Sequence, residues 1–391
     1  MNIIWITLES LLPPNSGGRL GVYKRLEQVA KTERVFLFYP YDDDKEIKYA
    51  EELEKYCEEV HAYSRKKNRK SAIKNLMRYP YTVSSRCIEA MKEDIRLCLH
   101  QNHIDLINVD FPHMCVDLLD LNIDIPVILN EHNIEWKVYR NIAKSKKNLI
   151  KKVIYYFDSI RLKRYELKIA KRIDFSRITY VSTDDMREMV REGVYKEEKT
   201  VLIPVGADVR KSLEKNEDGG INILFVGKMS YGPNIEAVKW FAKEIFPIIL
   251  KSFPNAVFYI VGKEPTAEVT RLSDNNIIVT GMVDSVEEFY DKSSLVVLPL
   301  KNGGGVKVKL LEAISYNVPV VSTSVGVEGT LFSDGKTIPV IDEKEGFANA
   351  CICALRGTYK DNYEKMYKLF LDQYTWESIG EKYIRMLRSV I

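Results

Sequence analysis

Short apolar runs alternate with helix-like segments along most of the chain, and this alternation restricts the fold more than any other feature. The apolar runs of the first half are Ile3–Thr7, Val35–Tyr39, Leu106–Val109, Pro126–Asn130, Arg177–Ser182 and Val201–Pro204. Most of the intervals between them carry apolar residues at helical spacing. Strands that alternate with helices predict a parallel sheet with both faces covered. We therefore expect an α/β fold.

The alternation is interrupted between Pro204 and Gly220, where glycine, asparagine and aspartate replace apolar residues. We place a linker there. Predicted strands then resume at Asn222–Val226, Val257–Val261, Ile277–Thr280, Leu295–Leu298, Val318–Ser322 and Thr337–Ile341. A chain of 391 residues is also long for one core. The sequence thus predicts two doubly wound domains, with ligands bound at the carboxyl ends of their strands in a cleft between the domains.

A glycine-rich loop follows the predicted strand Leu295–Leu298. Gly303, Gly304 and Gly305 precede a helical segment that contains Glu312. A glycine loop that feeds a helix presents free N–H groups to an anion, most often a phosphate. Glu312 would then accept hydrogen bonds from a ribose, as acidic residues do in other nucleotide sites. The alternative is a surface turn followed by a solvated glutamate.

Other strand ends carry further candidates. Lys228 follows the first strand of the second domain, where it would neutralise a diphosphate. Gly17 and Gly18 open a helix at Arg19 and offer a second N–H-rich turn, unless they serve only as a helix cap.

In the first domain, Asp110 and His113 follow one predicted strand, and Glu131 and His132 follow the next. A histidine and a carboxylate at this edge would contact a sugar or hold a proton. A role in capping the following helix is the alternative for His132.

Charge and composition narrow the functional classes. The net charge is only +3, yet residues 65–78 and 144–172 are strongly basic, and the second segment also has helically spaced apolar residues. Such a helix indicates contact with an anionic membrane surface, or else a solvated helix whose apolar face is core. No nucleic-acid-binding motif accompanies the charge, so we expect no nucleic-acid partner.

The six cysteines lack metal-site spacing, no run reaches the ~18 apolar residues of a membrane span, and no basic leader precedes the first strand. We therefore expect reduced thiols, no metal, and a cytoplasmic protein that is peripheral at the inner face of the cell membrane. The chain also lacks a P-loop and a nucleophile elbow. These absences leave group transfer from a nucleotide-activated donor as the expected chemistry.

The segments NILFVGKMSYGPNIEAVKWFAKEIFPII and VLPLKNGGGVKVKLLEAISYNVPVVSTSVGVEG resemble retaining glycosyltransferases of family 4. The resemblance extends over nearly the whole chain and implies the GT-B architecture, two Rossmann-like domains facing across a cleft. It implies an acceptor-binding domain at residues 1–208, joined by the C-terminal helix 375–391, and a donor-binding domain at 209–374. The substrate would be a UDP- or GDP-linked sugar, and no separate cofactor is implied.

The resemblance also implies roles for individual residues. Lys228 would bind the diphosphate, Glu312 the ribose and Gly281 the base. Asn234 stands where relatives often have a second cation. The remaining members of the expected donor site are Gly17, Gly18, Gly227, Gly303, Gly304, Gly305, Val306 and Lys307, and the acceptor-side residues are Arg19, Glu131 and His132.

Three departures from the family pattern are visible. Gly304 replaces the first glutamate of the family's pair, Asn234 replaces the cation, and Asp110 replaces a cleft histidine, with His132 nearby. We expect front-face transfer to a glycan or lipid-linked acceptor of the cell envelope, with Lys228, His132 and Asp110 as the catalytic candidates. A catalytically silent nucleotide-sugar-binding protein and a nucleotide-sugar epimerase are the alternatives.

Overall fold

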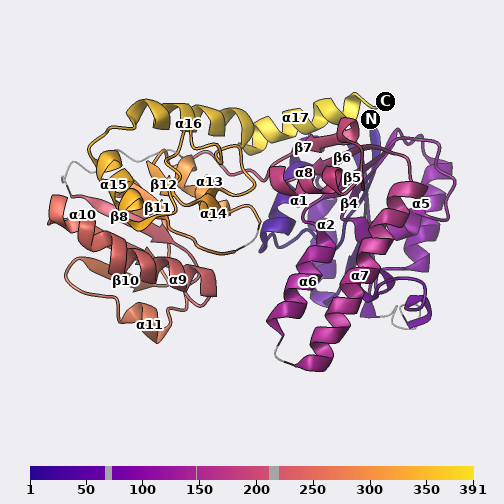
Figure 1. The fold of residues 1–391 in the computed structure, drawn as a ribbon. Coiled ribbons are helices and arrows are strands. Elements are labelled where there is room, and N and C mark those ends of the chain that lie inside the picture. The colour runs from indigo at the N-terminus through magenta and orange to yellow at the C-terminus, as the bar shows by residue number, and fades with distance from the viewer. Residues whose placement is uncertain (67–72, 147, 211–219, 304) are drawn as a thin grey trace. The chain divides into compact units, whose positions relative to one another are not determined.

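The computed structural model describes residues 1–66, 73–146, 148–210, 220–303 and 305–391. The chain forms two compact units, residues 1–204 with 379–391 and residues 205–378 (Figure 1). The division therefore falls after residue 204, where the sequence placed it after 208, and the tail joins the first unit from residue 379 rather than 375. Gly304, most of the predicted linker and part of the first basic segment lie outside the described residues.

A parallel sheet of seven strands in the order β3-β2-β1-β4-β5-β6-β7 forms the centre of the first unit. Its central strands are fully buried because helices cover both faces of a parallel sheet. The strands are β1 Asn2–Ile6, β2 Arg34–Tyr41, β3 Glu59–Ser64, β4 Leu106–Asp110, β5 Val127–Glu131, β6 Phe175–Tyr180 and β7 Thr200–Leu202.

The helices of the first unit include a long antiparallel pair, α6 and α7, which lie side by side in Figure 1. The C-terminal helix α17, Trp376–Arg388, contributes Ile379–Arg388 to this unit. The other elements are α1 Gly17–Val29, η1 Asp44–Tyr49, α2 Ala50–Leu53, α4 Tyr81–Ser84, α5 Glu89–Gln101, η3 Pro112–Leu118, α6 Glu135–Ser145, α7 Leu149–Arg172, α8 Thr183–Arg191 and η4 Glu197–Lys199.

Strand β3 was missed by the sequence prediction. Its residues, EVHAYS, contain no apolar run, and none of its side chains is fully buried because it is an edge strand. It is placed by backbone pairing with β2, from Phe36 opposite Glu59 to Tyr41 opposite Ser64.

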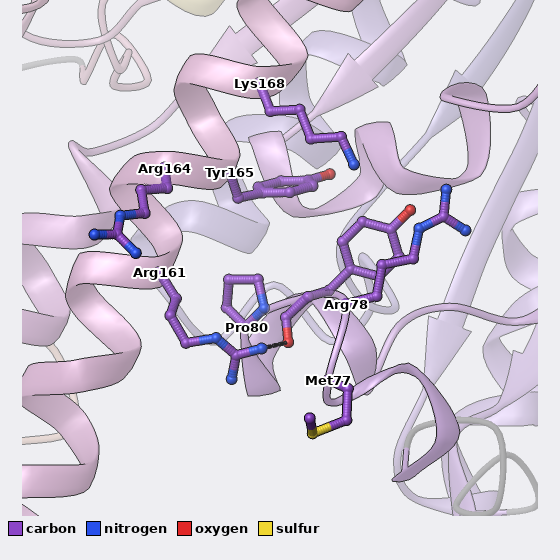
Figure 2. A pocket seen from close by; sticks show the side chains of 8 residues that line it. Met77, Arg78, Pro80, Arg161, Arg164, Tyr165 and Lys168 are labelled. Atoms are coloured by element: carbon purple, nitrogen blue, oxygen red, sulfur yellow. Dashed lines mark hydrogen bonds between the residues drawn. The ribbon is translucent and has the colours of Figure 1, made fainter.

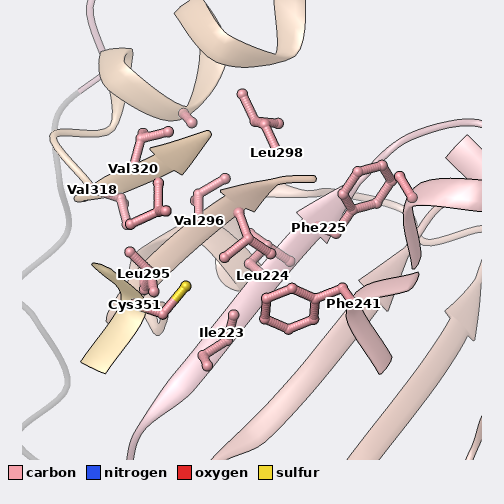
Figure 3. Packing of buried hydrophobic residues seen from close by; sticks show 14 of the residues in the cluster. Ile223, Leu224, Phe225, Phe241, Leu295, Val296, Leu298, Val318, Val320 and Cys351 are labelled. Atoms are coloured by element: carbon pink, nitrogen blue, oxygen red, sulfur yellow. The ribbon is translucent and has the colours of Figure 1, made fainter. Parts of the chain in front are cut away.

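The second unit is built on a parallel sheet in the order β10-β9-β8-β11-β12. Apolar residues of its strands pack against the helices, and Figure 3 shows Leu224, Phe225, Leu295 and Val296 with Phe241 in this core. The strands are β8 Asn222–Val226, β9 Val257–Val261, β10 Ile277–Gly281, β11 Leu295–Leu298 and β12 Val320–Ser322.

The prediction of a strand at Thr337–Ile341 was wrong. Only a single bridge joins Val340 to Ser322, and Pro339 in the middle of this segment has no N–H to donate to a ladder. The helices of the second unit are α9 Gly232–Trp240, a π-helical turn η5 Phe241–Ile245, α10 Phe246–Ser252, α11 Ala267–Thr270, α12 Glu287–Asp291, α13 Val308–Ser315, α14 Ser324–Val327, α15 Lys344–Leu355 and α16 Lys360–Gln373. Helix α16 was not predicted, although Tyr363, Met366 and Phe370 mark its buried face.

Candidate functional site

The loops after β8 and β11 meet at the point where the strand order of the second unit reverses. Strand β8 pairs with β9 on one side and with β11 on the other, so the chain leaves these two neighbouring strands in opposite directions. In open α/β sheets ligands bind at such a reversal, beyond the carboxyl ends of the strands. Gly227 and Lys228 follow β8, and the glycine loop follows β11. The topology therefore brings the two predicted donor-site segments to one edge.

A chain of hydrogen bonds joins these segments. The Asn234 amide donates from Nδ2 to the backbone oxygen of Lys228 at 2.9 Å. Its Oδ1 accepts from the Lys309 ammonium at 2.7 Å. Burial lowers the pKa of Lys309 to about 8, against the opposing effect of Glu312. Lys309 has no carboxylate partner at ion-pair distance among the described residues. Lys309 therefore places a cation beside Asn234, the position where the sequence seemed to lack one.

The other two lysines of this edge have carboxylate partners. Lys228 lies 2.9 Å from Glu264 and is half exposed. Lys307 lies 3.3 Å from Glu328, and its ammonium also donates to the backbone oxygens of Gly303 and Gly305, at 3.3 and 2.5 Å. Burial lowers the pKa of Lys307. Lys307 therefore holds the glycine loop in place, and Lys228 forms a half-exposed ion pair with Glu264. Of the three lysines, Lys309 is the one without a carboxylate partner among the described residues.

Close packing explains Gly227. A Cβ atom added there would lie 2.7 Å from the Asn234 amide nitrogen and 2.8 Å from the Lys309 ammonium. A Cβ on Gly262, which has φ of +150°, would lie 1.8 Å from the backbone oxygen of Gly227. Both glycines thus allow the turn after β8 to press against its neighbours.

The glycine loop needs glycine for a different reason. Gly303 and Gly305 have φ of +121° and +73°, values that other residues rarely adopt. Val306, the next residue, is partly buried, and α13 begins at Val308. Gly281, the predicted contact for the base, also has a positive φ of +71° at the end of β10. Its backbone oxygen accepts from the N–H of Gly262 at 3.1 Å.

Glu312 is partly buried in the second turn of α13 rather than fully solvated. Its Oε2 accepts from the Tyr290 hydroxyl at 3.3 Å, and the Tyr290 ring stacks on Tyr316 at 4.5 Å. Burial raises the pKa of Glu312, and the Tyr290 bond and the charges of Arg210 and Lys309 oppose that rise. A carboxylate held in this way keeps acceptor capacity for a hydroxyl group.

In the first unit, Asp110 is the centre of a buried polar network. Its Oδ1 accepts from Arg25 at 2.6 Å and lies 3.0 Å from His132 Nε2, and its Oδ2 accepts from the Trp5 indole at 2.5 Å. Burial alone would raise the pKa of Asp110, but Arg25 and the bonds from His132 and Trp5 outweigh it, so the pKa is lowered. Asp110 is fully buried. It can position neighbours but presents no oxygen to a substrate.

The same network joins the C-terminal helix to the sheet. Tyr383 of α17 lies 2.7 Å from Asn108 Oδ1 and 2.9 Å from Asn130 Oδ1. Arg25 lies over the Tyr383 ring at 5.3 Å. The last helix is therefore fixed to the first unit through buried hydrogen bonds.

His132 is oriented by two neighbours. Nε2 lies near both Arg25, which can only donate, and Asp110, whose carboxylate can only accept, so one tautomer satisfies one of the two contacts. In the tautomer that donates from Nε2 to Asp110, Nδ1 is the basic nitrogen. The ring stacks on Phe111 at 4.2 Å. Burial lowers the pKa of His132, with Asp110 opposing and Arg25 adding to that shift. A neutral, oriented imidazole suits hydrogen bonding to a hydroxyl group.

The remaining first-unit candidates are already engaged. Glu131 is buried and accepts from Tyr195 at 3.3 Å, and burial raises its pKa well above the usual value. Arg19 pairs with Glu9 at 2.6 Å and with Glu46 at 3.0 Å.

The predicted glycine turn is part of helix α1. Gly17 and Gly18 lie in its first turn, and Ser16 rather than a glycine is the N-cap. A Cβ would find no close neighbour at Gly17 and only an ordinary contact at Gly18. Neither position requires glycine for steric reasons, in contrast to Gly227 and Gly262.

The two basic segments meet beside α7. Arg161, Arg164 and Lys168 of α7 line a pocket of about 210 Å³ together with the segment Met77–Pro80. Figure 2 shows Arg161 and Lys168 beside this segment. Arg161 donates to the backbone oxygen of Tyr79 at 2.5 Å, so this guanidinium fixes the segment against the helix. The pocket is lined by cations and aromatic rings, without a carboxylate among its described lining residues.

The interpretation of the apolar face as core applies to the second half of the long basic helix, and the first half exposes its apolar residues. Leu162, Tyr165 and Ile169 are buried in the core of the first unit. Toward its start, Leu149 is 76% exposed, Ile150 72% and Phe157 61%, together with Val153 and Ile154. Within the described residues, no helix combines the length and apolarity that a membrane crossing requires.

The sequence analysis missed Lys309, Tyr290 and Glu264. Lys309 was visible as the second lysine of the KVKLLE segment, two residues after Lys307. Its proximity to Asn234, 75 residues earlier, depends on the pairing of β8 with β11.

Two parallel-sheet α/β domains, each with helices on both faces of its sheet, define the class of doubly wound α/β proteins. More specifically, the two domains match glycosyltransferase structures of the GT-B architecture. The chain is similar to Anabaena Alr3699/HepE in complex with UDP, with a TM-score of 0.63, 14% identity and 100% of each chain covered. It is also similar to sucrose-phosphate synthase from Thermosynechococcus elongatus, with a TM-score of 0.59, 14% identity, and 100% and 98% of the two chains covered.

The sequence comparisons agree with the fold. Residues 220–356 match the family model described as Glycosyl transferases group 1, so the second unit contains a domain of that kind. An uncharacterised 44.6 kDa protein in the cps region of Klebsiella pneumoniae is 24% identical over 395 residues, which cover 97% of this chain and 96% of the relative.

Proposed function

We propose that the protein is a glycosyltransferase that moves a sugar from a nucleotide diphosphate to a glycan or lipid-linked acceptor in cell-envelope polysaccharide synthesis. One observation carries the proposal: within a domain that matches glycosyl transferases group 1, the Asn234 amide joins the Lys309 ammonium to the backbone of Lys228 at the reversal of the strand order, where the glycine loop follows β11. The cps-region relative supports the polysaccharide context. HepE, a structural neighbour, has been solved with UDP-glucose, which supports a nucleotide sugar as donor.

The proposed donor pose follows from the second unit. The diphosphate lies against the glycine loop and the start of α13, where backbone N–H groups and the helix dipole favour an anion. Lys228 and Lys309 neutralise its charge, Glu312 accepts from the ribose hydroxyls, and the backbone around Gly281 contacts the base. UDP and GDP sugars both fit this description.

For the mechanism we propose retention of configuration by front-face transfer. Asp110 and Glu131 were the conceivable nucleophiles, and both are buried and hydrogen-bonded within the first unit. The leaving diphosphate would be stabilised by the two lysines, and one of its oxygens would take the acceptor's proton. A well-placed donor contributes about 3 kcal/mol to such stabilisation. His132, oriented by Asp110, would hydrogen-bond a sugar hydroxyl through Nδ1.

We further propose that transfer needs no divalent cation, because the lysines supply the positive charge that the departing diphosphate requires. Activity that persists in excess chelator supports this part of the proposal. Loss of activity that Mg²⁺ or Mn²⁺ restores would contradict it and leave the transferase assignment intact.

The experiment for the main proposal starts with a thermal-shift screen against nucleoside diphosphates and their sugars. A ligand at ~100 times its dissociation constant adds roughly 2.7 kcal/mol of stability. The donor that binds is then incubated with pure protein, and slow hydrolysis is measured by product analysis. Hydrolysis that depends on Lys309 and Glu312 supports a transferase. Binding without turnover identifies a silent binding protein, and an epimerised nucleotide sugar identifies an epimerase.

We also propose that the exposed apolar residues at the start of α7 contact an anionic membrane surface. Lys144, Lys151 and Lys152 surround them, which matches the combination of apolar insertion and electrostatic attraction in interfacial helices. Sedimentation with anionic vesicles, reduced by Ile150→Ser with Phe157→Ser, supports this contact. Equal binding of the protein to anionic and neutral vesicles would contradict the proposed membrane contact.

A further inference from the structure

A second pocket in the first unit, of about 470 Å³, has a lining that suits a phosphate ester. It lies between the α6–α7 pair and the segment Tyr81–Arg86. Its lining includes Arg65, Arg86, Lys146, Lys151, Tyr139 and Tyr155. Since a water molecule occupies ~30 Å³ in the liquid, the pocket has room for a phosphate group and an attached ring.

The two arginines of this pocket are incompletely paired. Arg65 donates to Asp42 at 2.7 Å and to Ser85 at 3.2 Å. Arg86 donates to the backbone oxygen of Thr82 at 2.7 Å, and within the described residues no carboxylate lies at ion-pair distance from it. The Nε atoms of both guanidiniums are buried without a hydrogen-bond partner. A buried charge and a buried donor without a hydrogen-bond partner both reduce the stability of the fold. An anion bound in the pocket would offset both costs.

The electrostatics favour an anion. Burial lowers the pKa of Arg86 to about 10, and the charge of Arg65 adds to that shift, so Arg86 stays charged at neutral pH although the two guanidiniums repel each other. Lys146 and Lys151 add two cations without a carboxylate partner in the described part of the chain. Asp158 is the one acidic residue in the described lining, and its Oδ1 accepts from the Tyr81 backbone N–H.

The aromatic part of the lining offers a surface to a sugar ring or an apolar chain. Tyr139 and Tyr155 pack with their ring centroids 6.0 Å apart, and Tyr81 is exposed. Ile154, also in the lining, belongs to the exposed apolar residues of α7. The lining of the pocket thus combines cationic side chains with aromatic and apolar ones.

Its position connects it to the acceptor side. Arg65 directly follows β3 and Asp42 follows β2, so both stand at the carboxyl edge of the sheet. Asp110, the last residue of β4, and His132, directly after β5, stand at the same edge. Parallel strands place their carboxyl ends, and hence their ligand-binding loops, on one side of the sheet.

We propose that this pocket binds the phosphate or diphosphate group of the acceptor, so that the acceptor substrate is a phosphorylated sugar or lipid rather than a neutral glycan. The proposal rests on the transferase function proposed above and names its acceptor class. Arg65 and Arg86 bind the phosphate oxygens, Lys146 and Lys151 add charge, and the tyrosines contact the attached group.

The first test measures binding of inorganic pyrophosphate to the full chain by calorimetry, with hydrogen–deuterium exchange to locate it. Protection is expected at residues 81–86 and around Tyr139. Lys146→Ala with Lys151→Ala should weaken this binding about tenfold or more, since hydrogen bonds to charged groups are worth roughly that factor. The matched control, Arg164→Ala with Lys168→Ala, removes the same charge from the pocket in Figure 2 and should change it less than twofold.

A second variant, Arg65→Gln with Arg86→Gln, should remove the protection at residues 81–86. Its melting temperature is measured in parallel, because Arg86 is largely enclosed. If that variant does not fold, the lysine pair and its control still decide the question.

The source of the phosphate is distinguished by two further probes. Glucose 1-phosphate represents a water-soluble acceptor, and polyprenyl phosphate in phosphatidylcholine vesicles represents a lipid-linked one. Vesicles that carry equal charge as phosphatidylglycerol are the control. Protection of residues 81–86 by either probe, but not by the control vesicles, supports the site and identifies the source.

Failure of this proposal is separable from failure of the proposed function. Pyrophosphate that also binds the donor site protects peptides around Gly303 and Glu312, which are read independently of residues 81–86. Two results overturn the acceptor-phosphate site and leave the transferase intact. One is donor hydrolysis by a protein that shows no protection at residues 81–86. The other is an equal loss of pyrophosphate binding in the Lys146→Ala, Lys151→Ala variant and in its control. Protection at 81–86 without donor binding would overturn the transferase instead.

Discussion

Lys309 offers the sharpest test of the donor site, because its ammonium is largely buried and its charge changes near neutral pH. Its ammonium donates to Asn234 and lies 4.3 Å from the Phe225 ring, so it is held in a partly apolar place. Replacing it with alanine removes a charge-assisted hydrogen bond to the diphosphate, worth about 1.5–3 kcal/mol. That range corresponds to a loss of about 10- to 150-fold in donor affinity.

The pH dependence of donor affinity gives a second, independent test of the role of Lys309. Burial lowers the pKa of Lys309 to about 8, and the diphosphate binds the protonated form. The charge is therefore present below pH 8 and lost as the pH rises above it, by roughly tenfold in the charged fraction for each unit. Donor affinity should fall between pH 7 and 9 in the wild type. Lys309→Arg should keep its affinity over that range, since a guanidinium stays protonated.

Calorimetry with the nucleotide sugar found in the thermal-shift screen measures both effects. Lys251→Ala, which removes one exposed lysine from the same unit, is the matched control and should bind like the wild type. If Lys309→Ala binds the donor as tightly as this control, or if the arginine variant follows the wild-type pH profile, the assignment of Lys309 to the diphosphate is wrong.

Three more predictions test other parts of the structure. Gly262→Ala should unfold the second unit at lower temperature, because its Cβ would meet the backbone oxygen of Gly227 at 1.8 Å; an unchanged melting curve contradicts this packing. Asp110→Asn leaves the buried Arg25 without its counter-charge and should cost about 3–5 kcal/mol in urea unfolding. Since the pKa of Asp110 is lowered in the folded state, the wild type should lose this stability as the pH falls below about 4, and the variant should lack that step. Glu312→Gln should weaken binding of the ribonucleotide more than of its deoxyribose analogue, and an equal effect on both would exclude the ribose contact.

Sequence patterns were sufficient for the elements whose signal is local. Buried parallel strands such as β1 and β11 are continuous apolar runs, and the positive φ of Gly303 and Gly305 is what a glycine-rich loop after a strand predicts. The edge strand β3 and the segment Thr337–Ile341 were misjudged for opposite reasons. The first has little apolar signal yet pairs along its whole length, and the second has a strong apolar signal but a proline that prevents a ladder.

The sequence by itself determined the α/β class, the restart of the fold after the linker, and the glycine loop with Glu312 beyond it, because each of these depends on neighbours along the chain. Only the tertiary structure decided which charges act together. It brought Lys309 to Asn234 and enclosed Asp110 among Arg25, His132 and Trp5. Within the described residues it also left the guanidinium of Arg86 without a carboxylate at ion-pair distance. Strand pairing joins residues that are far apart in sequence, and burial then sets the pKa and the partner of each group, which no local pattern records.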